Sequence, residues 1–493
     1  MKTFYQSISI ILSSVIVGCT TMPSATQQIQ SLPPLFPDYI NVTMPCNIAP
    51  LRFALADSCK VDDAWVIFLA GNDSVVVRYS DEQFAISEQT WHRLVSKNEE
   101  LKVQIRIVQN GVCADYLPFN ISISSDSIDS YLSYRLIEPG YEVWNEMGLY
   151  QRNVESFSEK TIITNKQLDY GCVNCHSFCR NNSETMLFHA RANYGATYLI
   201  QNKQIEKLNT KTAQTISSLV YPYWHPSGQY VAFSTNTTKQ LFHTSDHNRI
   251  EVFDSKSDIV ILDTRNKTIF SSPNLNSAKA FETFPTFTPD GKRLIFCSAD
   301  SVQMPQDYLN VKYSVCSVSF DAANGMIGTI VDTLYNAKVD GASASFPRVS
   351  PNGRWLMFTR ATYGNFSIWH SDADLCLIDL IDTTKTYRNL AAINSSEADS
   401  YHSWSSNGKW VVFSSRRIDG LYTRLFITHI DDEGNFTKPF LLPQADARYY
   451  NRLMKSFNIP EFTTNEMNVS GYEISKVAKE SSGVQLLFNE NKK

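Results

Sequence analysis

The chain has 493 residues, of which 43% are hydrophobic, 12% aromatic and 19% charged, and its formal net charge is −5. This length exceeds one compact core, so we expect two or more domains or one large repeat architecture. Lysines and arginines form no basic stripe, which argues against nucleic acid as a partner.

The N-terminus has the pattern of an export signal. Lys2 precedes the apolar run 8–17, which is too short to span a bilayer. The run ends at Cys19 in Ile-Val-Gly-Cys, which resembles the lipobox of bacterial lipoproteins. We therefore predict a lipoprotein signal peptide over residues 1–19, lipidation of Cys19 and a polar tether over 20–34. The alternative is an ordinary signal peptide that contains a cysteine.

This export signal also predicts a location. We expect a cell-envelope protein, an outer-membrane lipoprotein that faces the periplasm or the cell surface and contacts the membrane through its lipid. No later segment is long and apolar enough to predict a transmembrane helix.

Residues 35–133 predict a small β domain. Strand-like runs cover 64–69, 74–79 and 101–107, and Gly71-Asn72-Asp73 between the first two is a turn signal. An immunoglobulin-like β-sandwich fits this pattern. We expect residues 134–181 to be a linker.

An internal repeat follows the linker. Each copy has an aromatic residue, a short strand, a turn containing glycine and a second apolar strand. Proline presets one backbone dihedral of the turn and glycine takes its positive φ. The four plain copies begin at Tyr221, Phe284, Phe346 and Tyr401 and have their turn glycines at Gly228, Gly291, Gly353 and Gly408.

Repeats of this kind predict the blades of a β-propeller. A fifth copy lies at 182–190, where Phe188 occupies the place of Phe233, Phe296, Phe358 and Phe413. A sixth blade could come from 438–442 with the tail or from 131–170. We therefore predict an all-β chain with a six-bladed propeller over 182–460 and a C-terminal tail over 461–493.

The repeat resembles the propeller of the TolB family, whose blades carry a hairpin like Pro289-Asp290-Gly291. The resemblance covers about residues 180 to 440. It implies the fold and says little about function, because propellers host many unrelated activities.

A cysteine motif stands just before the repeat, in a stretch of the linker that we predict to be a haem-binding loop. Cys172 and Cys175 are three residues apart and His176 follows, the spacing that attaches a c-type haem. The thiols would bond the porphyrin and His176 would bind the iron, with His189 or Met186 as the sixth ligand. A zinc site that adds Cys179, or a disulfide, is the alternative.

Other chemistry is less well supported by the sequence. There is no Gly-x-Ser-x-Gly elbow and no phosphate-binding glycine loop, so we predict no catalytic residues. Aspartates such as Asp254 and Asp372 could bind Ca²⁺, although such residues more often cap turns.

The combination of lipobox, β domain, Cys-x-x-Cys-His and repeat is similar to a group of Bacteroidetes lipoproteins described as TolB-like or cytochrome c-like. That resemblance implies haem c at Cys172, Cys175 and His176. We therefore predict a membrane-anchored propeller used for electron transfer or redox sensing, with a redox or envelope protein as partner. The alternative is a non-redox scaffold for a glycan or protein, with the two cysteines in a disulfide or zinc site.

Overall fold

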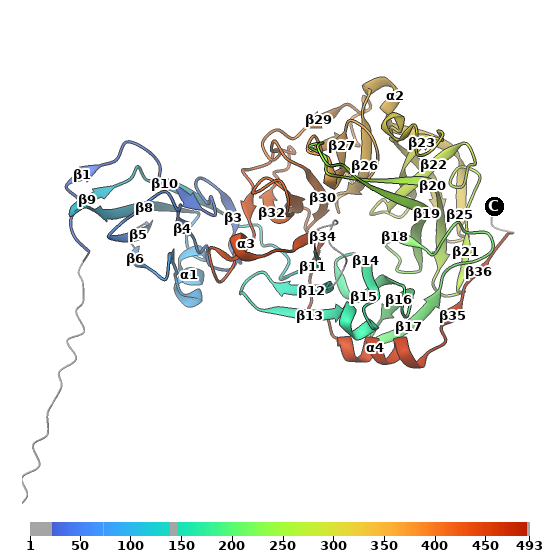
Figure 1. Cartoon of the computed structure of the whole chain (residues 1–493), viewed down its shortest axis with the longest axis horizontal. Helices are drawn as coiled ribbons and strands as arrows, with labels where there is room; N and C mark the ends of the chain where they lie inside the picture. The colour runs from blue at the N-terminus through green and yellow to red at the C-terminus, as the bar shows by residue number, and fades with distance from the viewer. Residues whose placement is uncertain (1–21, 72, 139–145, 491–493) are drawn as a thin grey trace, which may run out of the picture.

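The computed structural model describes residues 22–71, 73–138 and 146–490. The chain is nearly all β, as predicted, with one sheet domain at the N-terminal end and six further sheets gathered beside it (Figure 1). None of the helices in these ranges is long and apolar enough to cross a bilayer. The signal peptide and Cys19 lie outside the described residues.

The N-terminal domain is built on one large sheet. The strand order is β1-β9-β8-β5-β6-β7, and β10 joins β3 to the far end of β8. A two-stranded sheet of β2 and β4 and the helix α1 complete the domain. The strands are β1 (Gln27–Gln28), β2 (Leu35–Phe36), β3 (Thr43–Pro45), β4 (Ala54–Leu55), β5 (Asp63–Ala70), β6 (Asp73–Ser80), β7 (Gln83–Phe84), β8 (Glu100–Gln109), β9 (Val112–Asp115) and β10 (Phe119–Ser124), and α1 is Glu88–Val95.

Alternating polarity explains the packing of this sheet. Along β8, Leu101, Val103, Ile105 and Ile107 are buried, while the residues between them are more exposed. The buried side packs on α1, which Ser87 caps through its side chain and which buries Trp91 completely. The domain is thus one large sheet covered by α1 and the small β2–β4 sheet, not a sandwich of two large sheets as predicted. Its first strand, β1, also lies in the segment 20–34 that we predicted to be a tether.

The remaining chain forms six sheets, each built on four antiparallel strands, and two of these sheets gain a fifth, parallel strand at the edge. The first is β34-β11-β12-β13, in which the C-terminal strand β34 pairs with β11. The strands of this sheet and the next are β11 (Tyr131–Ile137), β12 (Gly148–Asn153), β13 (Glu159–Thr164), β34 (Ser456–Thr463), β14 (Cys172–Cys179), β15 (Asn182–Arg191), β16 (Ala196–Gln201) and β17 (Gln204–Asn209).

The other four sheets follow in chain order. Their strands are β18 (Val220–Trp224), β19 (Tyr230–Phe242), β20 (Ile250–Asp263), β21 (Thr268–Phe270), β22 (Ala280–Phe287), β23 (Arg293–Asp300), β24 (Ser314–Asp321), β25 (Met326–Tyr335), β26 (Ser343–Val349), β27 (Trp355–Ala361), β28 (Asp374–Asp379), β29 (Tyr387–Asn389), β30 (Asp399–Trp404), β31 (Trp410–Ser415), β32 (Arg424–His429) and β33 (Phe440–Leu441). The four predicted turn glycines all have positive φ, which closes the hairpin between the first two strands of each sheet.

The first strand of every sheet lies toward a common axis. These inner strands, β34, β14, β18, β22, β26 and β30, contact one another in that order, and β30 contacts β34 again (Figure 1). The sheets are therefore arranged around a ring, and β34 brings the C-terminal part of the chain into the sheet that the N-terminal part begins.

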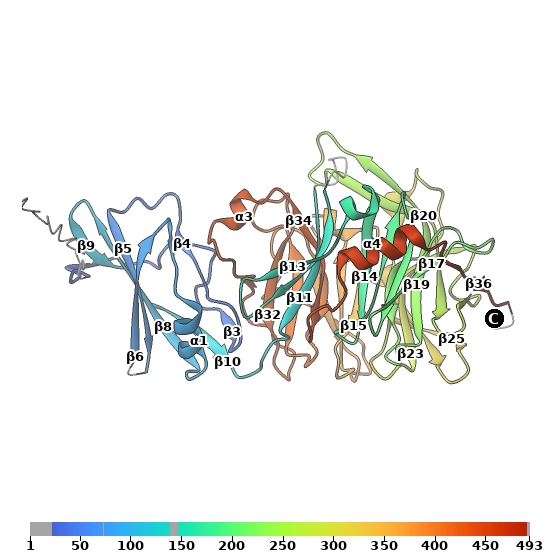
Figure 2. The ribbon, with the colours of Figure 1, turned by 90° about the horizontal axis from the view of Figure 1, so that it is seen from below.

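Two predicted boundaries are wrong for this reason. The segment 134–181, which we predicted to be a linker, contributes β11 to β13 and the inner strand β14. The segment 461–493, which we predicted to be a tail, contains the end of β34, the helix α4 (Gly471–Glu480) and the strands β35 (Val484–Gln485) and β36 (Leu487–Phe488). The last two strands extend the outer edges of neighbouring sheets (Figure 2).

Short helices and the contact between the domains complete the fold. The helices are α2 (Ala337–Asp340) and α3 (Tyr449–Arg452), with 3₁₀ turns at Asn165–Leu168, Tyr308–Asn310 and Ser367–Trp369. The Tyr39 hydroxyl donates to the Leu441 carbonyl and the Trp410 indole donates to the Asp126 carbonyl, so the N-terminal domain packs on the last sheet. One hydrophobic core runs through both.

Candidate functional site

The same irregularity occurs in the inner strand of all six sheets. Two consecutive residues of the inner strand oppose a single residue of the second strand, which is a β-bulge. The first residue of each bulge has a φ between 49° and 55°. The bulges are Cys175-His176, Tyr221-Pro222, Phe284-Pro285, Phe346-Pro347, Tyr401-His402 and Ile459-Pro460.

A buried aromatic residue of the second strand faces each bulge. In five sheets it is the phenylalanine that the sequence repeat identified, including Phe188, so the predicted fifth copy is confirmed. In the sixth sheet Tyr134 of β11 takes this place opposite Ile459-Pro460. Proline is tolerated at the second bulge position because that residue leaves the ladder and need not donate its N–H.

The cysteine motif is one of these inner strands. Cys175-His176-Ser177-Phe178-Cys179 of β14 occupies the same register as Tyr401-His402-Ser403-Trp404-Ser405 of β30. Cys175 therefore stands where four other strands have tyrosine or phenylalanine and one has isoleucine. This is a position inside a sheet, not the loop that the prediction assumed.

The first bulge residues form a layer across the axis. Ring centroids lie 4.9 Å apart for Tyr221 and Phe284, 5.7 Å for Phe284 and Phe346 and 5.0 Å for Phe346 and Tyr401. Ile459 packs on the same cluster. The layer closes the axis with large side chains at every position except Cys175.

A cavity of about 290 Å³ lies on one side of this layer. Its floor includes Cys175, Tyr221, Phe346 and Ile459, and its upper walls come from the turns that follow the inner strands, such as those at Pro226 and Pro289. Aromatic walls and a few polar groups are typical of a small-molecule site. The polar residues that line it include His176, Ser177, Arg180, Asn181, Tyr223, Arg348, His402, Ser403 and Glu461.

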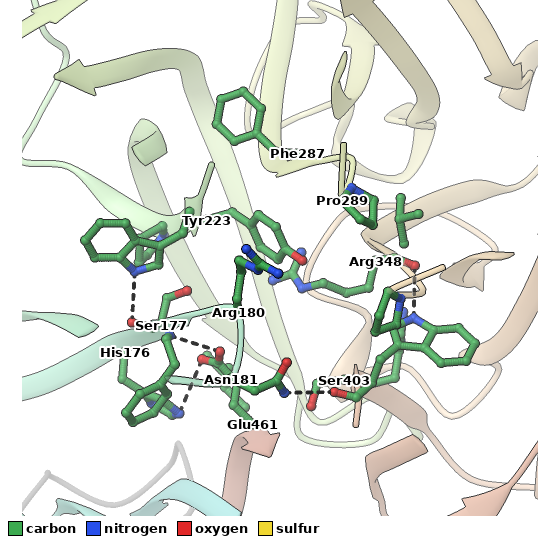
Figure 3. A pocket seen from close by; sticks show the side chains of 18 of the residues that line it. His176, Ser177, Arg180, Asn181, Tyr223, Phe287, Pro289, Arg348, Ser403 and Glu461 are labelled. Carbon is green, nitrogen blue, oxygen red and sulfur yellow. Dashed lines mark hydrogen bonds and ion pairs between the residues drawn. The ribbon is translucent and has the colours of Figure 1, made fainter. Parts of the chain in front are cut away.

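Arg348 supplies a positive charge to this cavity. Its guanidinium carbon lies 3.9 Å from the ring centroid of Phe346 and 4.8 Å from that of Tyr223 (Figure 3). Nη1 donates to the Pro347 carbonyl at 2.8 Å, and no carboxylate of the described residues pairs with the guanidinium. Burial lowers the Arg348 pKa, and the surrounding acidic groups partly offset this effect. Arg180 adds a second, exposed guanidinium to the lining.

Glu461 and His176 lie together on another wall (Figure 3). Glu461 Oε2 accepts from the Phe178 N–H at 3.1 Å, and Oε1 lies 3.7 Å from His176 Nε2. Burial raises the Glu461 pKa to about 7, against the opposing effects of that N–H and of Arg348. Burial, and next the charge of Arg135, lower the His176 pKa to about 3 against an opposing effect of the Ile459 backbone, so the imidazole is neutral at physiological pH.

His176 is unusual because its imidazole is buried and its hydrogen-bonding groups are unsatisfied. The residue is 4% exposed and neither ring nitrogen has a hydrogen-bond partner among the described residues. Its counterpart His402 places Nε2 3.0 Å from the Met357 carbonyl. An unsatisfied buried imidazole that lines a cavity indicates a place for a ligand group.

The two motif cysteines do not share this cavity. Cys175 lines it, whereas Cys172 is buried beside Arg191 in the ladder with β15 and does not. A porphyrin in this cavity would meet His176 and one thiol, so the residues in this arrangement fit a doubly attached haem poorly. Haem attachment itself stays a prediction.

The predicted sixth iron ligands lie elsewhere in the same sheet. Met186 is fully buried in a hydrophobic cluster with Phe178 and Phe188. His189 is buried, its Nδ1 lies 3.2 Å from the Thr197 hydroxyl, and burial lowers its pKa to about 3. Neither residue lines the cavity that His176 faces.

The described residues show neither of the alternatives for the cysteines. The nine described cysteines, Cys179 included, are free thiols. No group of three or more histidine, cysteine, aspartate or glutamate side chains in the described ranges is placed to hold a metal ion. Asp254 instead accepts hydrogen bonds from Asn236, Thr238 and Asn365.

Comparisons with known proteins find distant structural likeness only. No protein-family model and no curated protein sequence matches the chain. A puromycin hydrolase is similar at 11% identity and a TM-score of 0.37, over 63% of this chain and 45% of that one. Prolyl oligopeptidase B from Galerina marginata is similar at 9% identity and a TM-score of 0.36, over 70% of this chain and 49% of that one. A DUF4784 family protein from Bacteroides caccae is similar at 7% identity and a TM-score of 0.30, over 81% of this chain and 94% of that one.

The predicted function as a haem protein for electron transfer or redox sensing is contradicted by these findings. The similar solved structures include hydrolases and peptidases, and this chain spans less than half the length of the puromycin hydrolase and of prolyl oligopeptidase B. At these TM-scores the likeness assigns no activity to this chain.

Sequence reasoning missed the two charged residues of the cavity. Arg348 and Glu461 occupy the same place in their strands, two residues after the start of the bulge, where β14 has Ser177 and β30 has Ser403. Aligning Ile459-Pro-Glu-Phe with Phe346-Pro-Arg-Val would have found them. The segment was overlooked because it lies far beyond the last plain copy and lacks the glycine turn.

Proposed function

We propose that the protein is a six-bladed β-propeller that binds a small organic carboxylate in its axial cavity. The observation that carries this function is Arg348, a guanidinium that lines the cavity and has no carboxylate partner among the described residues.

Two features support the closed ring. The six inner strands contact one another in cyclic order, and the bulge recurs in every one of them. Pairing of β34 with β11 joins the two ends of the ring, which is the means by which a propeller avoids an open seam. The likeness of the repeat to TolB belongs to the same proposal.

The choice of a carboxylate follows from the chemistry of the cavity. A guanidinium binds a planar carboxylate through two parallel hydrogen bonds, and a dry site strengthens them. Trp224, Phe287 and Trp404 supply apolar walls for the rest of the ligand. At about 290 Å³ the cavity suits a molecule with one ring or a short chain.

Calorimetry with matched probes tests this function. We expect 3-phenylpropanoate to bind and 3-phenylpropanol, which lacks the charge, to bind at least tenfold more weakly. Arg348→Met should remove most of the affinity for the acid, and Lys256→Met, which removes an exposed charge in β20, should not. Equal binding of acid and alcohol, or full affinity in Arg348→Met, would overturn the proposal.

The envelope location is proposed on the N-terminal sequence alone. Cys19 would carry the lipid, and the lipid would hold the protein at the outer membrane. Labelled palmitate should enter the full-length protein in a bacterial host and should not enter Cys19→Ala.

A further inference from the structure

The cavity holds charges of both signs that are not paired with each other. Arg348 reaches it from β26 and Glu461 from β34, and no ion pair joins them in the structure. Figure 3 shows Glu461 beside His176, and the guanidinium of Arg348 near Tyr223. Each of the two charged groups is therefore available to a ligand in the cavity.

Glu461 keeps one carboxylate oxygen for a ligand. Oε2 accepts a hydrogen bond from the Phe178 N–H at 3.1 Å. Oε1 accepts no hydrogen bond from the described residues, and its nearest basic neighbour is His176 Nε2 at 3.7 Å, beyond hydrogen-bond distance. A donor that enters the cavity can reach this oxygen.

His176 adds a second acceptor at the same place. Both of its ring nitrogens are buried and have no hydrogen-bond partner in the described residues. A neutral imidazole has one lone pair to offer, and its N–H can face the other way. Glu461 and His176 together can therefore take two hydrogens of one ammonium group, which has three to donate.

We infer that the ligand is a zwitterion of the size of an amino acid or dipeptide, with its carboxylate on Arg348 and its ammonium group on Glu461 and His176. This inference rests on the proposed carboxylate site and adds the second charge to it. The aromatic walls formed by Trp224, Phe287 and Trp404 favour a ligand with an apolar side chain.

The position of these residues explains why one cavity can recognise both groups. Arg348 and Glu461 occupy equivalent places in two inner strands, with β30 between them around the ring. That strand has only Ser403 in this place, so it presents no charge between the two. The two charges affect each other's pKa through the cavity, but no ion pair joins them.

The test compares three probes on the folded protein at pH 8, where a carboxyl with a pKa of about 7 is ionised. L-Phenylalanine has both charged groups, 3-phenylpropanoate lacks the ammonium group, and 2-phenylethylamine lacks the carboxylate but stays protonated at pH 8. We expect L-phenylalanine to bind at least tenfold more tightly than either relative.

Two variants separate this inference from the proposed function. Glu461→Gln should abolish the preference for L-phenylalanine over 3-phenylpropanoate, and Arg348→Met should weaken both probes. Glu100→Gln, an exposed change in β8, serves as the control for Glu461→Gln and should leave all affinities unchanged.

The outcomes distinguish the inferred zwitterion from the proposed carboxylate site. If 3-phenylpropanoate binds as tightly as L-phenylalanine and depends on Arg348, the zwitterion is wrong and the carboxylate site stands. If glycyl-phenylalanine binds and phenylalanine does not, the ligand is a dipeptide rather than a single amino acid. If no carboxylate probe binds, both statements fall.

Discussion

The inner strands β14 and β30 have nearly the same sequence pattern and opposite surroundings. Cys175-His176-Ser177-Phe178 and Tyr401-His402-Ser403-Trp404 share a bulge, a buried histidine and the same register. In β30 the Nε2 of the histidine is hydrogen-bonded to the Met357 carbonyl, although its Nδ1 has no partner among the described residues, and the tyrosine packs on Phe346. In β14 the histidine has no partner and the tyrosine is replaced by a small thiol. Both strands line the cavity, but only β14 presents to it a thiol and an imidazole that lacks a hydrogen-bond partner among the described residues.

The largest expected effect comes from exchanging the first bulge residues. Tyr401→Cys removes a ring from the axial layer and leaves a cavity, so we expect a loss of about 3 kcal/mol in the free energy of unfolding. Cys175→Tyr adds a ring where the layer has its one small residue. It should change stability much less and should weaken binding of 3-phenylpropanoate at least tenfold, because the ring would occupy the cavity floor.

Urea denaturation and calorimetry measure these two effects. An equal loss of stability in both variants would mean that β14 has no more room than β30. Unchanged binding in Cys175→Tyr would mean that the cavity floor is not where the ligand lies.

Glu461, which faces His176 but not His402, should make stability depend on pH. Its pKa is raised from 4.5 to about 7 in the folded protein, so between these values the unfolded chain loses a proton that the folded chain keeps. Stability from this group is therefore full below pH 4.5 and falls as the pH rises toward 7. Glu461→Gln should gain up to about 3 kcal/mol over the wild type at pH 8 and nothing at pH 4.

Thermal unfolding from pH 4 to pH 8 measures this gain. A constant difference between Glu461→Gln and the wild type across that range would show that the carboxyl has an ordinary pKa in the fold.

The two histidines should respond differently to removal. His402→Ala leaves the Met357 carbonyl without its donor and opens a void, which should cost about 2 kcal/mol. His176→Ala breaks no internal hydrogen bond and should cost about half as much. Denaturation at pH 8 compares them with both imidazoles neutral, and similar losses would contradict the difference between the two strands.

The smallest expected effect tests the links between neighbouring inner strands. Trp224 Nε1 donates to the Ser177 carbonyl at 3.1 Å, and Trp404 Nε1 donates to the Arg348 carbonyl at 3.3 Å. Replacing either tryptophan by phenylalanine keeps a ring and loses one hydrogen bond, which should cost about 1 kcal/mol in each case. A much larger loss of stability for Trp224→Phe than for Trp404→Phe would show that the hydrogen bond between β18 and β14 matters more than the one between β30 and β26.

Much of the fold could be predicted because it repeats. Each of the four plain copies carries its own turn, with a glycine at positive φ, and its own buried phenylalanine, and these are local requirements that the residues themselves express. The registers of Phe188, Phe233, Phe296, Phe358 and Phe413 confirm the repeat.

The site could be predicted only in part. His176 and Cys175 were identified for the wrong surroundings, because a short motif has the same letters in a loop and in a strand. The residues of Cys-x-x-Cys-His do not by themselves predict a β-bulge at Cys175. The repeat predicts it only when β14 is aligned with β30.

The sequence alone determined that this chain is all β, that its C-terminal part repeats and that certain aromatic residues are buried, since short-range patterns of polarity and turn residues specify these features. Tertiary structure alone decided that β34 returns to pair with β11, which joins residues more than 300 positions apart, such as Ser133 and Glu461. That pairing places Glu461 next to His176 and across the axial cavity from Arg348. The reason is physical: a charge acquires its function from the groups around it, and here those groups come from strands that only the closed arrangement of the sheets brings together.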